Sequence, residues 1–283
     1  MTTWSISVDA CEGARCYLSR NWFLGQWLKK AGRLGKGKPD IAYLQAGRRV
    51  PDLGQRISVV QTVTHVSEEL ARKFEQAEIE LTSTQRSCSA ADVVVSSSRV
   101  QTEALIAVGV DAKKIVEVRP ASGMPNAGLK KVAPRSGKLL CGVVGQPIPR
   151  KRTSVARHAA WDFGADIKHA HSVPYPEIAD WIRNIDLLLF PSLGDSWGLA
   201  VSEAISCGVP AVVTEASGAS EQVRETGAGI VTGTAEGAFR AGVSAVLGDR
   251  VLLMKLTRAA RKAPVRTLEE WAADLVAAVE GRL

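Results

Sequence analysis

The sequence predicts an α/β protein made of two domains, each built around a parallel β-sheet. Its 283 residues suit two cores of ordinary size. Its composition, 46% hydrophobic and 23% charged, is that of a folded globular protein. Short apolar segments alternate with helical patterns along the chain, which is typical of parallel sheets that helices cover on both faces. We therefore expect a doubly wound arrangement in each half.

The second half shows this alternation most clearly. Its predicted strands are residues 138–145, 185–192 and 209–215, each a short and mostly apolar run. Helical patterns lie between them. The helix before the third strand is closed by Gly208, with Pro210 just beyond, which is a common way to end a helix.

The first half repeats the pattern more loosely. Its predicted strands are "WSISVDA", "PDIAYLQAG", "RISVVQTVTH", "ADVVVSSS" and "KIVEVRP". A long polar helix is expected over residues 67–89. Residues 121–137 are rich in Gly, Pro, Ser and Lys, which is typical of a linker. We therefore expect one domain at 1–135 and a second at 136–283.

The net charge of +7 belongs entirely to the first half. Residues 1–135 hold 20 Lys and Arg against 13 Asp and Glu, whereas residues 136–283 hold 16 against 16. A basic cluster between residues 29 and 56 would attract a polyanion or an anionic membrane, unless it is only a solvated face. Its candidate acceptor-binding residues are Lys29, Lys30, Arg33, Arg48 and Arg49.

Several classes of protein are disfavoured. The five cysteines are scattered, without a C-x-x-C pair, so neither a disulfide framework nor a zinc site is indicated. The N-terminus lacks the pattern of a signal peptide, and no apolar run approaches the roughly 20 residues that cross a bilayer. We expect a cytoplasmic protein, in the host cytoplasm if phage-encoded, without a metal site. Three histidines are expected to be ordinary surface residues: His158, His169 and His171.

A candidate ligand site follows the strand at 185–192. Ligands of open α/β sheets bind beyond the carboxyl ends of the strands. Gly198 opens the next helix, whose N-terminal amides suit a phosphate. Asp195 precedes this helix and Glu203 lies about one turn inside it, so both carboxylates can accept hydrogen bonds from sugar hydroxyls. Alternatively, Asp195 only caps the helix and Glu203 is solvated.

The stretch "GDSWGLAVSEAISCGVPAVVTEASGASEQV" resembles the signature of family 4 glycosyltransferases, which have the two-domain GT-B fold. That signature is an acid, seven residues, a Glu, then Ala-x-x-x-Gly-x-Pro-Val and Gly-x-x-Glu. The resemblance implies that Glu203 holds the nucleotide ribose and that Asp195 contacts the donor sugar as a catalytic residue. Gly198 and Leu199, next to Ser196, would then bind the diphosphate. Asp195 departs from the usual Glu by one methylene.

The stretch "VVGQPIPRKR" resembles the family's V-G-R-L-x-x-x-K-G, whose Arg and Lys neutralise the leaving diphosphate. The resemblance implies that Lys151 is catalytic and that Gly145 lies in the donor loop. Gln146, also in this donor-binding loop, replaces the Arg, and Arg152 replaces the last Gly. Either Arg150 or Arg152 would have to turn inward to supply the missing cation. Alternatively, this is a basic surface turn.

The first half resembles the same family in shorter stretches. "DACEGARCYLSRNWFLGQWLKKAG" is similar to the first glycine-rich loop and helix, with Gly13 and Ala14 at the two usual glycines. "VVQTVTH" is similar to the strand whose last residue, here His65, lies near the transferred sugar, although an ordinary strand-end histidine fits too. A strand-helix-strand unit usual in the family is missing before "PDIAYLQAG". The domain on the acceptor side of the GT-B cleft is therefore expected to be trimmed.

The resemblance implies a retaining glycosyltransferase, a hexosyltransferase that uses a nucleotide sugar without a metal or other cofactor. Orientation and stabilisation of the leaving diphosphate would supply catalysis. The basic, trimmed first domain suggests DNA with hydroxymethylated bases as the acceptor, as in bacteriophage DNA modification. A membrane lipid or glycan is an alternative, because Trp22, Phe23 and Trp27 are interleaved with basic residues. An epimerase or hydrolase, or an inactive nucleic-acid-binding relative, is also open.

Overall fold

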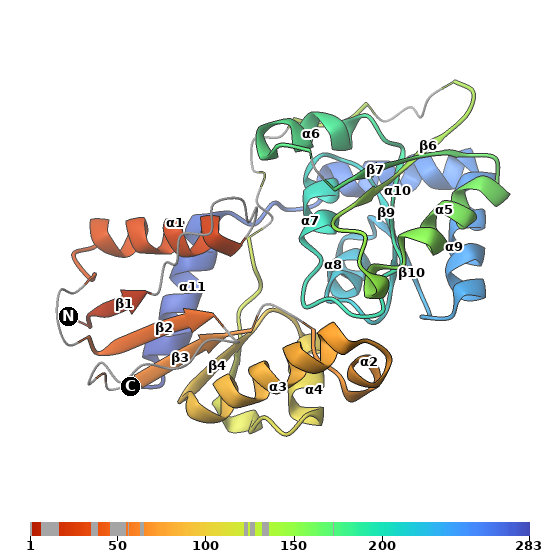
Figure 1. Ribbon diagram of the computed structural model, residues 1–283. Coiled ribbons are helices and arrows are strands. Elements are labelled where there is room, and N and C mark those ends of the chain that lie inside the picture. Colours follow the sequence, from red (N-terminus) through yellow and green to blue (C-terminus); the bar gives the residue numbers. More distant parts are fainter. Residues whose placement is uncertain are drawn as a thin grey trace. The chain divides into compact units, whose positions relative to one another are not determined.

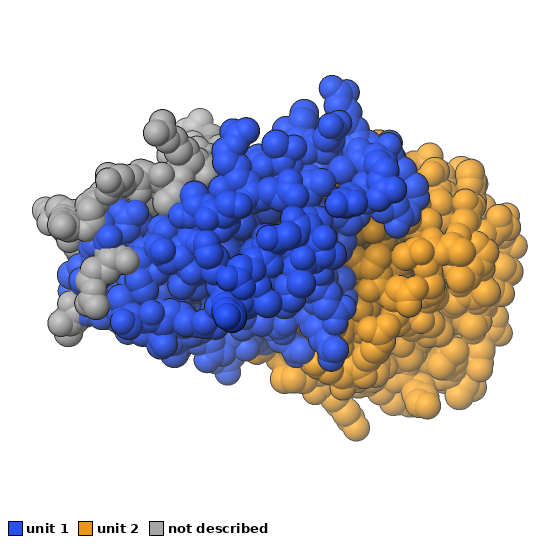
Figure 2. Space-filling model, turned by 90° about the horizontal axis from the view of Figure 1, so that it is seen from below, with its two compact units in different colours: residues 1–121, 266–283 blue, residues 122–265 orange. Residues whose placement is uncertain are grey.

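The computed structural model describes residues 2–6, 17–34, 39–45, 55, 57–62, 65–121, 124, 128–131, 136–171 and 173–283. The chain forms two compact units, coloured separately in Figure 2. Unit 1 comprises residues 1–121 and 266–283, and unit 2 comprises residues 122–265. Each unit contains a five-stranded parallel sheet with helices around it (Figure 1). The predicted α/β class with two Rossmann-like units is confirmed.

Unit 1 has the strand order β1-β2-β3-β4-β5. Its strands are β1 (Trp4–Ile6), β2 (Ile41–Gln45), β3 (Ile57–Gln61), β4 (Val93–Ser96) and β5 (Ile115–Glu117). Its helices before the linker are α1 (Tyr17–Lys30), α2 (Glu68–Lys73), α3 (Glu75–Ala90), α4 (Arg99–Ala107) and the short 3-10 helix η1 (Ala112–Lys114). Strands β3 and β4 are buried along their whole length, which explains their Val and Ile content.

The last helix of the chain, α11 (Leu268–Glu280), also belongs to unit 1. Its buried Trp271 and Leu275 pack in one hydrophobic cluster with Trp4 and Leu28. Figure 1 shows this blue helix among the red and orange elements of the first unit. Sequence periodicity predicted the helix and did not indicate what it packs against.

The domain division expected at residues 135 and 136 is therefore corrected in two places. The chain leaves unit 1 after Ala121, and it returns to unit 1 at Arg266. The return depends on the apolar face of α11, which completes the core of unit 1.

Unit 2 has the strand order β10-β9-β8-β6-β7. Its strands are β6 (Leu140–Val144), β7 (Asp166–Ala170), β8 (Leu187–Phe190), β9 (Ala211–Thr214) and β10 (Gly229–Thr232). Its helices are η2 (Pro149–Lys151), α5 (Thr153–Asp162), α6 (Tyr175–Arg183), α7 (Leu199–Ser206), α8 (Ala219–Thr226), α9 (Glu236–Gly248) and α10 (Arg250–Lys262). Two separate clusters of buried apolar side chains include alternate residues of the central strands, as expected for a doubly wound sheet.

The carboxyl ends of β6 and β8 lie side by side, because these two strands pair in parallel register. The loops that follow them, residues 145–152 and 191–198, carry most of the predicted donor-binding residues. Among the residues that the structure describes, no helix has the length and apolar character needed to span a bilayer.

Candidate functional site

Asp195 lies at the centre of a charged cluster at the carboxyl edge of the unit 2 sheet. Its Oδ2 forms an ion pair with Lys151 Nζ and lies 3.9 Å from Arg150 Nη1. Its Oδ1 accepts hydrogen bonds from the amides of Gly198, at 2.7 Å, and Trp197, at 3.4 Å. The structure thus brings together residues that the sequence placed in two separate motifs.

The carboxyl group of Asp195 is ionised at neutral pH. Burial by itself raises the pKa of Asp195, which is only 9% exposed. The positive charges of Lys151 and Arg150, and hydrogen bonds from Lys151 and the Gly198 amide, outweigh burial and hold this pKa below its ordinary value. Asp195 can therefore accept hydrogen bonds but cannot donate a proton in a reaction at neutral pH.

The basic loop after β6 is fastened to the loop after β8. The Leu193 amide donates to the Arg150 carbonyl at 2.8 Å, and Arg150 Nη1 donates to the Gly194 carbonyl at 2.8 Å. Lys151 Nζ lies 4.7 Å from the centre of the Phe190 ring, at the end of β8. These contacts fix both cations beside Asp195.

Arg152 has a different role from its two neighbours. Its φ of 46° lies in the left-handed region, and it is the one non-glycine residue with a positive φ in the described part of the chain. Arg152 Nε donates to the Pro191 carbonyl and Nη1 to the Thr234 carbonyl, both at 2.8 Å. Burial lowers the pKa of Arg152. Arg150, and not Arg152, is thus the second cation beside Asp195.

Gly198 is required by the backbone at the start of α7. Its φ is 79°, and a Cβ added there would lie 2.8 Å from Cβ of Ala219. The first amides of a helix have no partner within the helix. The Gly198 amide is taken by Asp195, so Leu199 and Ala200 are the next amides at this N-terminus that can meet an anion.

The other predicted donor-binding residues of unit 2 lie in the loops after β6 and β8 or on α7. Glu203 is half-buried on α7, and Ser196 is buried in the loop before it. Gly145 follows β6 with a φ of 122°, and its amide donates to the Ala170 carbonyl at 2.9 Å. Gln146 is exposed beside it.

The residues predicted in the first half lie in unit 1 or outside the described residues. His65 follows β3 and is 9% exposed. Lys29 and Lys30 are exposed at the end of α1, whereas Arg33 forms an ion pair with Glu280 and is mostly buried. Arg33 is thus engaged inside unit 1 rather than presented as a free cation. Three predicted residues fall outside the described part of the chain: Gly13, Arg48 and Arg49.

A buried polar chain that supports the loop of Asp195 was missed by the sequence analysis. Trp197 Nε1 donates to Ser202 Oγ at 2.8 Å, and Ser202 Oγ donates to Gln222 Oε1 at 2.9 Å. These bonds join the loop to α7 and α8. A tryptophan between an acid and a glycine was the available signal, since a buried indole N–H needs an acceptor.

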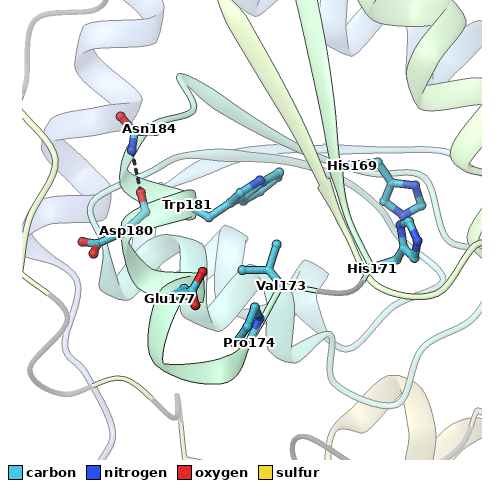
Figure 3. A pocket seen from close by; sticks show the side chains of 8 residues that line it. All are labelled: His169, His171, Val173, Pro174, Glu177, Asp180, Trp181 and Asn184. Atoms are coloured by element: carbon cyan, nitrogen blue, oxygen red, sulfur yellow. Dashed lines mark hydrogen bonds between the residues drawn. The ribbon is translucent and has the colours of Figure 1, made fainter.

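A pocket of about 530 Å³ lies between the end of β7 and α6 (Figure 3). Its lining consists of His169, His171, Val173, Pro174, Glu177, Asp180, Trp181 and Asn184. His169 Nε2 donates to the Gly145 carbonyl at 2.7 Å, so the pocket adjoins the loop after β6. Two histidines expected to be plain surface residues therefore line a cavity.

Part of the chain matches a known protein family. Residues 129–263 match the family model described as Glycosyl transferases group 1. The D-inositol 3-phosphate glycosyltransferase of Paenarthrobacter aurescens is 37% identical over 65 residues, which cover 23% of this chain and 16% of that protein. The protein of the same name from Jonesia denitrificans is 32% identical over 118 residues, covering 40% of this chain and 28% of that protein. These matches thus span less than a third of the relatives' own length.

Solved structures resemble nearly the whole chain in fold. Sucrose-phosphate synthase from Thermosynechococcus elongatus has a TM-score of 0.67 at 14% identity, covering 97% of this chain and 81% of that one. HepE from Anabaena in complex with UDP has a TM-score of 0.65 at 14% identity, covering 91% and 82%. WaaG, a glycosyltransferase involved in lipopolysaccharide biosynthesis, has a TM-score of 0.62 at 13% identity, covering 95% and 85%. Residues 129–263 thus match the group 1 glycosyl transferases, on a chain whose fold of two Rossmann-like units is that of the GT-B glycosyltransferases.

Proposed function

We propose that the protein is a retaining glycosyltransferase that moves a sugar from a nucleotide-sugar donor to an acceptor hydroxyl. The observation that carries this proposal is the cluster of Lys151, Arg150 and Asp195 at the N-terminus of α7. Two cations and a helix N-terminus suit a diphosphate, and the carboxylate suits a sugar hydroxyl. The cluster lies inside the segment that matches the group 1 family model.

In the proposed site, the diphosphate lies against the Leu199 amide and between the side chains of Arg150 and Lys151. Their charges stabilise the phosphate as it leaves, which is the main contribution of such a site to the rate. Glu203 holds the ribose, and Asp195 accepts from a sugar hydroxyl. No metal ion takes part in the proposed mechanism. The acceptor hydroxyl attacks the anomeric carbon on the face from which the phosphate departs, so that the anomeric configuration is retained, and its proton passes to the departing phosphate.

The pocket beside Gly145 offers space for the nucleotide base. It adjoins the diphosphate position through the His169–Gly145 hydrogen bond. The rings of His169, His171 and Trp181 offer surfaces on which a flat heterocycle can stack. HepE was solved with UDP, which supports a nucleoside diphosphate as part of the donor here.

For the acceptor, we propose an anionic molecule, with hydroxymethylated DNA as the first candidate. The support is the surplus of basic residues in the first half, with Lys29 and Lys30 exposed at the end of α1. A second candidate is a small phosphorylated polyol, since the matched relatives are named D-inositol 3-phosphate glycosyltransferases. The same charges would serve either acceptor.

One experiment tests the activity and separates the acceptors. The protein is incubated with UDP-, GDP- and ADP-hexoses together with hydroxymethylated duplex DNA, unmodified DNA or inositol phosphate, and added hexose mass is measured. Transfer to hydroxymethylated DNA alone supports the first acceptor, and transfer to inositol phosphate supports the second. Lys151→Ala should lower turnover by orders of magnitude without unfolding the protein. NMR of the product tests retention. No transfer and no nucleotide release with any pair would contradict the proposed activity.

A further inference from the structure

Asp195 and Lys151 neutralise each other at the place where the donor would bind. Their side chains are only 12% and 20% exposed, and Arg150 is the next cation, at 3.9 Å from the same carboxylate oxygen. A partly buried pair is weakly screened by water, so each charge depends strongly on its partner.

Both oxygens of the carboxylate are engaged. Oδ1 accepts from the amides of Gly198 and Trp197, which hold the loop and the start of α7. Oδ2 faces the two cations. Of the two oxygens, Oδ2 is therefore the one whose partner can change when a ligand enters.

Binding of a nucleoside diphosphate would deprive Asp195 Oδ2 of Lys151 and would supply no other hydrogen-bond donor. Its phosphates attract Lys151 Nζ away from Asp195 and add negative charge beside the carboxylate. A buried charge that loses its partner is destabilised strongly. A complete nucleotide sugar also brings hydroxyl groups, and one of them can donate to Oδ2 in place of Lys151.

We propose that Asp195 makes the site discriminate between the intact nucleotide sugar and the free nucleoside diphosphate. Lys151 exchanges Asp195 for the diphosphate, and a sugar hydroxyl takes the place of Lys151 at Oδ2. The product left after transfer lacks that hydroxyl, so it binds less tightly and leaves the site. This inference rests on the proposed function, because it assumes that the sugar lies beside Asp195.

Calorimetry with two ligands tests the exchange. The ligands are the nucleotide sugar selected by the panel of UDP-, GDP- and ADP-hexoses and the matching nucleoside diphosphate. Asp195→Asn should tighten binding of the nucleoside diphosphate about tenfold, or about 1.4 kcal/mol, because no buried charge is left without a partner. The same change should leave binding of the nucleotide sugar unchanged or weaker, because a hydroxyl acceptor is lost.

The exchange also requires Lys151. In a Lys151→Ala background, Asp195→Asn should tighten binding of the nucleoside diphosphate by much less than tenfold, because no lysine leaves the carboxylate when the diphosphate binds. Asp162→Asn is a matched control, since Asp162 pairs with Arg240 elsewhere in unit 2, and neither affinity should change. If Asp195→Asn does not fold, as judged by its melting temperature, Asp195→Ser replaces it, because a serine hydroxyl can still accept from the Gly198 amide.

Two results would overturn the inference in different ways. Suppose that wild type binds both ligands. If Asp195→Asn then changes both affinities by the same factor, or weakens binding of the nucleoside diphosphate, the proposed exchange is wrong, but the proposed donor site is not contradicted. If wild type binds neither ligand, the proposed function fails and this inference fails with it.

Discussion

Trp4 in the first strand and Glu280 in the last helix are hydrogen-bonded, with the indole Nε1 donating to Oε1 at 3.1 Å. The same carboxylate pairs with Arg33 after α1. The two ends of the chain therefore meet in unit 1, and the stability of that unit depends on its last helix.

Trp271→Ala is expected to destabilise unit 1 by about 3–5 kcal/mol, because the removed side chain is fully buried and leaves a cavity. Denaturant unfolding followed by circular dichroism measures the loss. Val251→Ala, at a position that is 68% exposed in unit 2, is the control and should change the free energy of unfolding by less than about 0.5 kcal/mol. Equal effects of the two substitutions would refute the role given to α11.

Gly198→Ala should cost roughly 1–3 kcal/mol in backbone strain and weaken binding of a nucleoside diphosphate. The cause is the positive φ of Gly198 and the contact of the new Cβ with Ala219. Gly237→Ala in α9 is the matched control, because a Cβ there meets no atom within 4 Å. Thermal melting and calorimetry check both variants, and normal nucleotide binding by Gly198→Ala would remove this turn from the site.

Arg150→Gln and Arg152→Gln should have opposite signatures. Arg150→Gln should weaken nucleoside diphosphate binding about tenfold, because it removes a charge from the site, and should lower stability less than Arg152→Gln, because only one hydrogen bond, to Gly194, is lost. Arg152→Gln should lower the free energy of unfolding by about 1–3 kcal/mol, because two hydrogen bonds to Pro191 and Thr234 are lost. Calorimetry and denaturant unfolding on both proteins separate the two effects.

A charge placed at Gln146 provides a rescue test for Arg150. Gln146→Arg in the Arg150→Gln background should recover part of the lost affinity, since Gln146 is exposed in the same loop. Arg157→Gln on α5 removes one positive charge outside the loop and is the control for Arg150→Gln; it should leave the affinity unchanged. If a new arginine far from the loop restored the affinity as well as Gln146→Arg does, the effect would depend on net charge alone.

The stability that Asp195 contributes should depend on pH in acid. Its pKa in the folded protein is lowered from an ordinary value of 3.8. A lowered pKa means that the contribution is present above that ordinary value and is lost as the pH falls through the folded value. The difference in free energy of unfolding between wild type and Asp195→Asn should be constant near neutral pH and shrink below about pH 4. A difference that grows in acid would contradict the sign.

Local sequence was enough to predict the α/β class, the five strands of unit 1 and three of the five strands of unit 2, and it missed β7 and β10. It also singled out Lys151 and Asp195, which the structure brings together. Each of these depends on a short pattern, such as a glycine that starts a helix after an apolar strand. The choice between Arg150 and Arg152 could not be made in this way, because it depends on the left-handed backbone of one residue.

Two other features depend on contacts between distant parts of the sequence. The amphipathic pattern of α11 predicts a helix with one buried face, but it does not say which sheet that face covers. Likewise, spacing assigned Asp195 to the predicted donor site, but it did not predict the ion pair with Lys151, which exists only because the loops after β6 and β8 meet.

The return of α11 to the first sheet means that unit 2 is an uninterrupted insertion into unit 1. Residues 122–265 form one continuous segment, whereas unit 1 is assembled from two pieces of chain. A protein cut after residue 135 would therefore separate unit 1 from its own last helix, whereas excision of the insertion removes unit 2 as a single piece. During synthesis, the hydrophobic core of unit 1 therefore cannot be completed until α11 has been made.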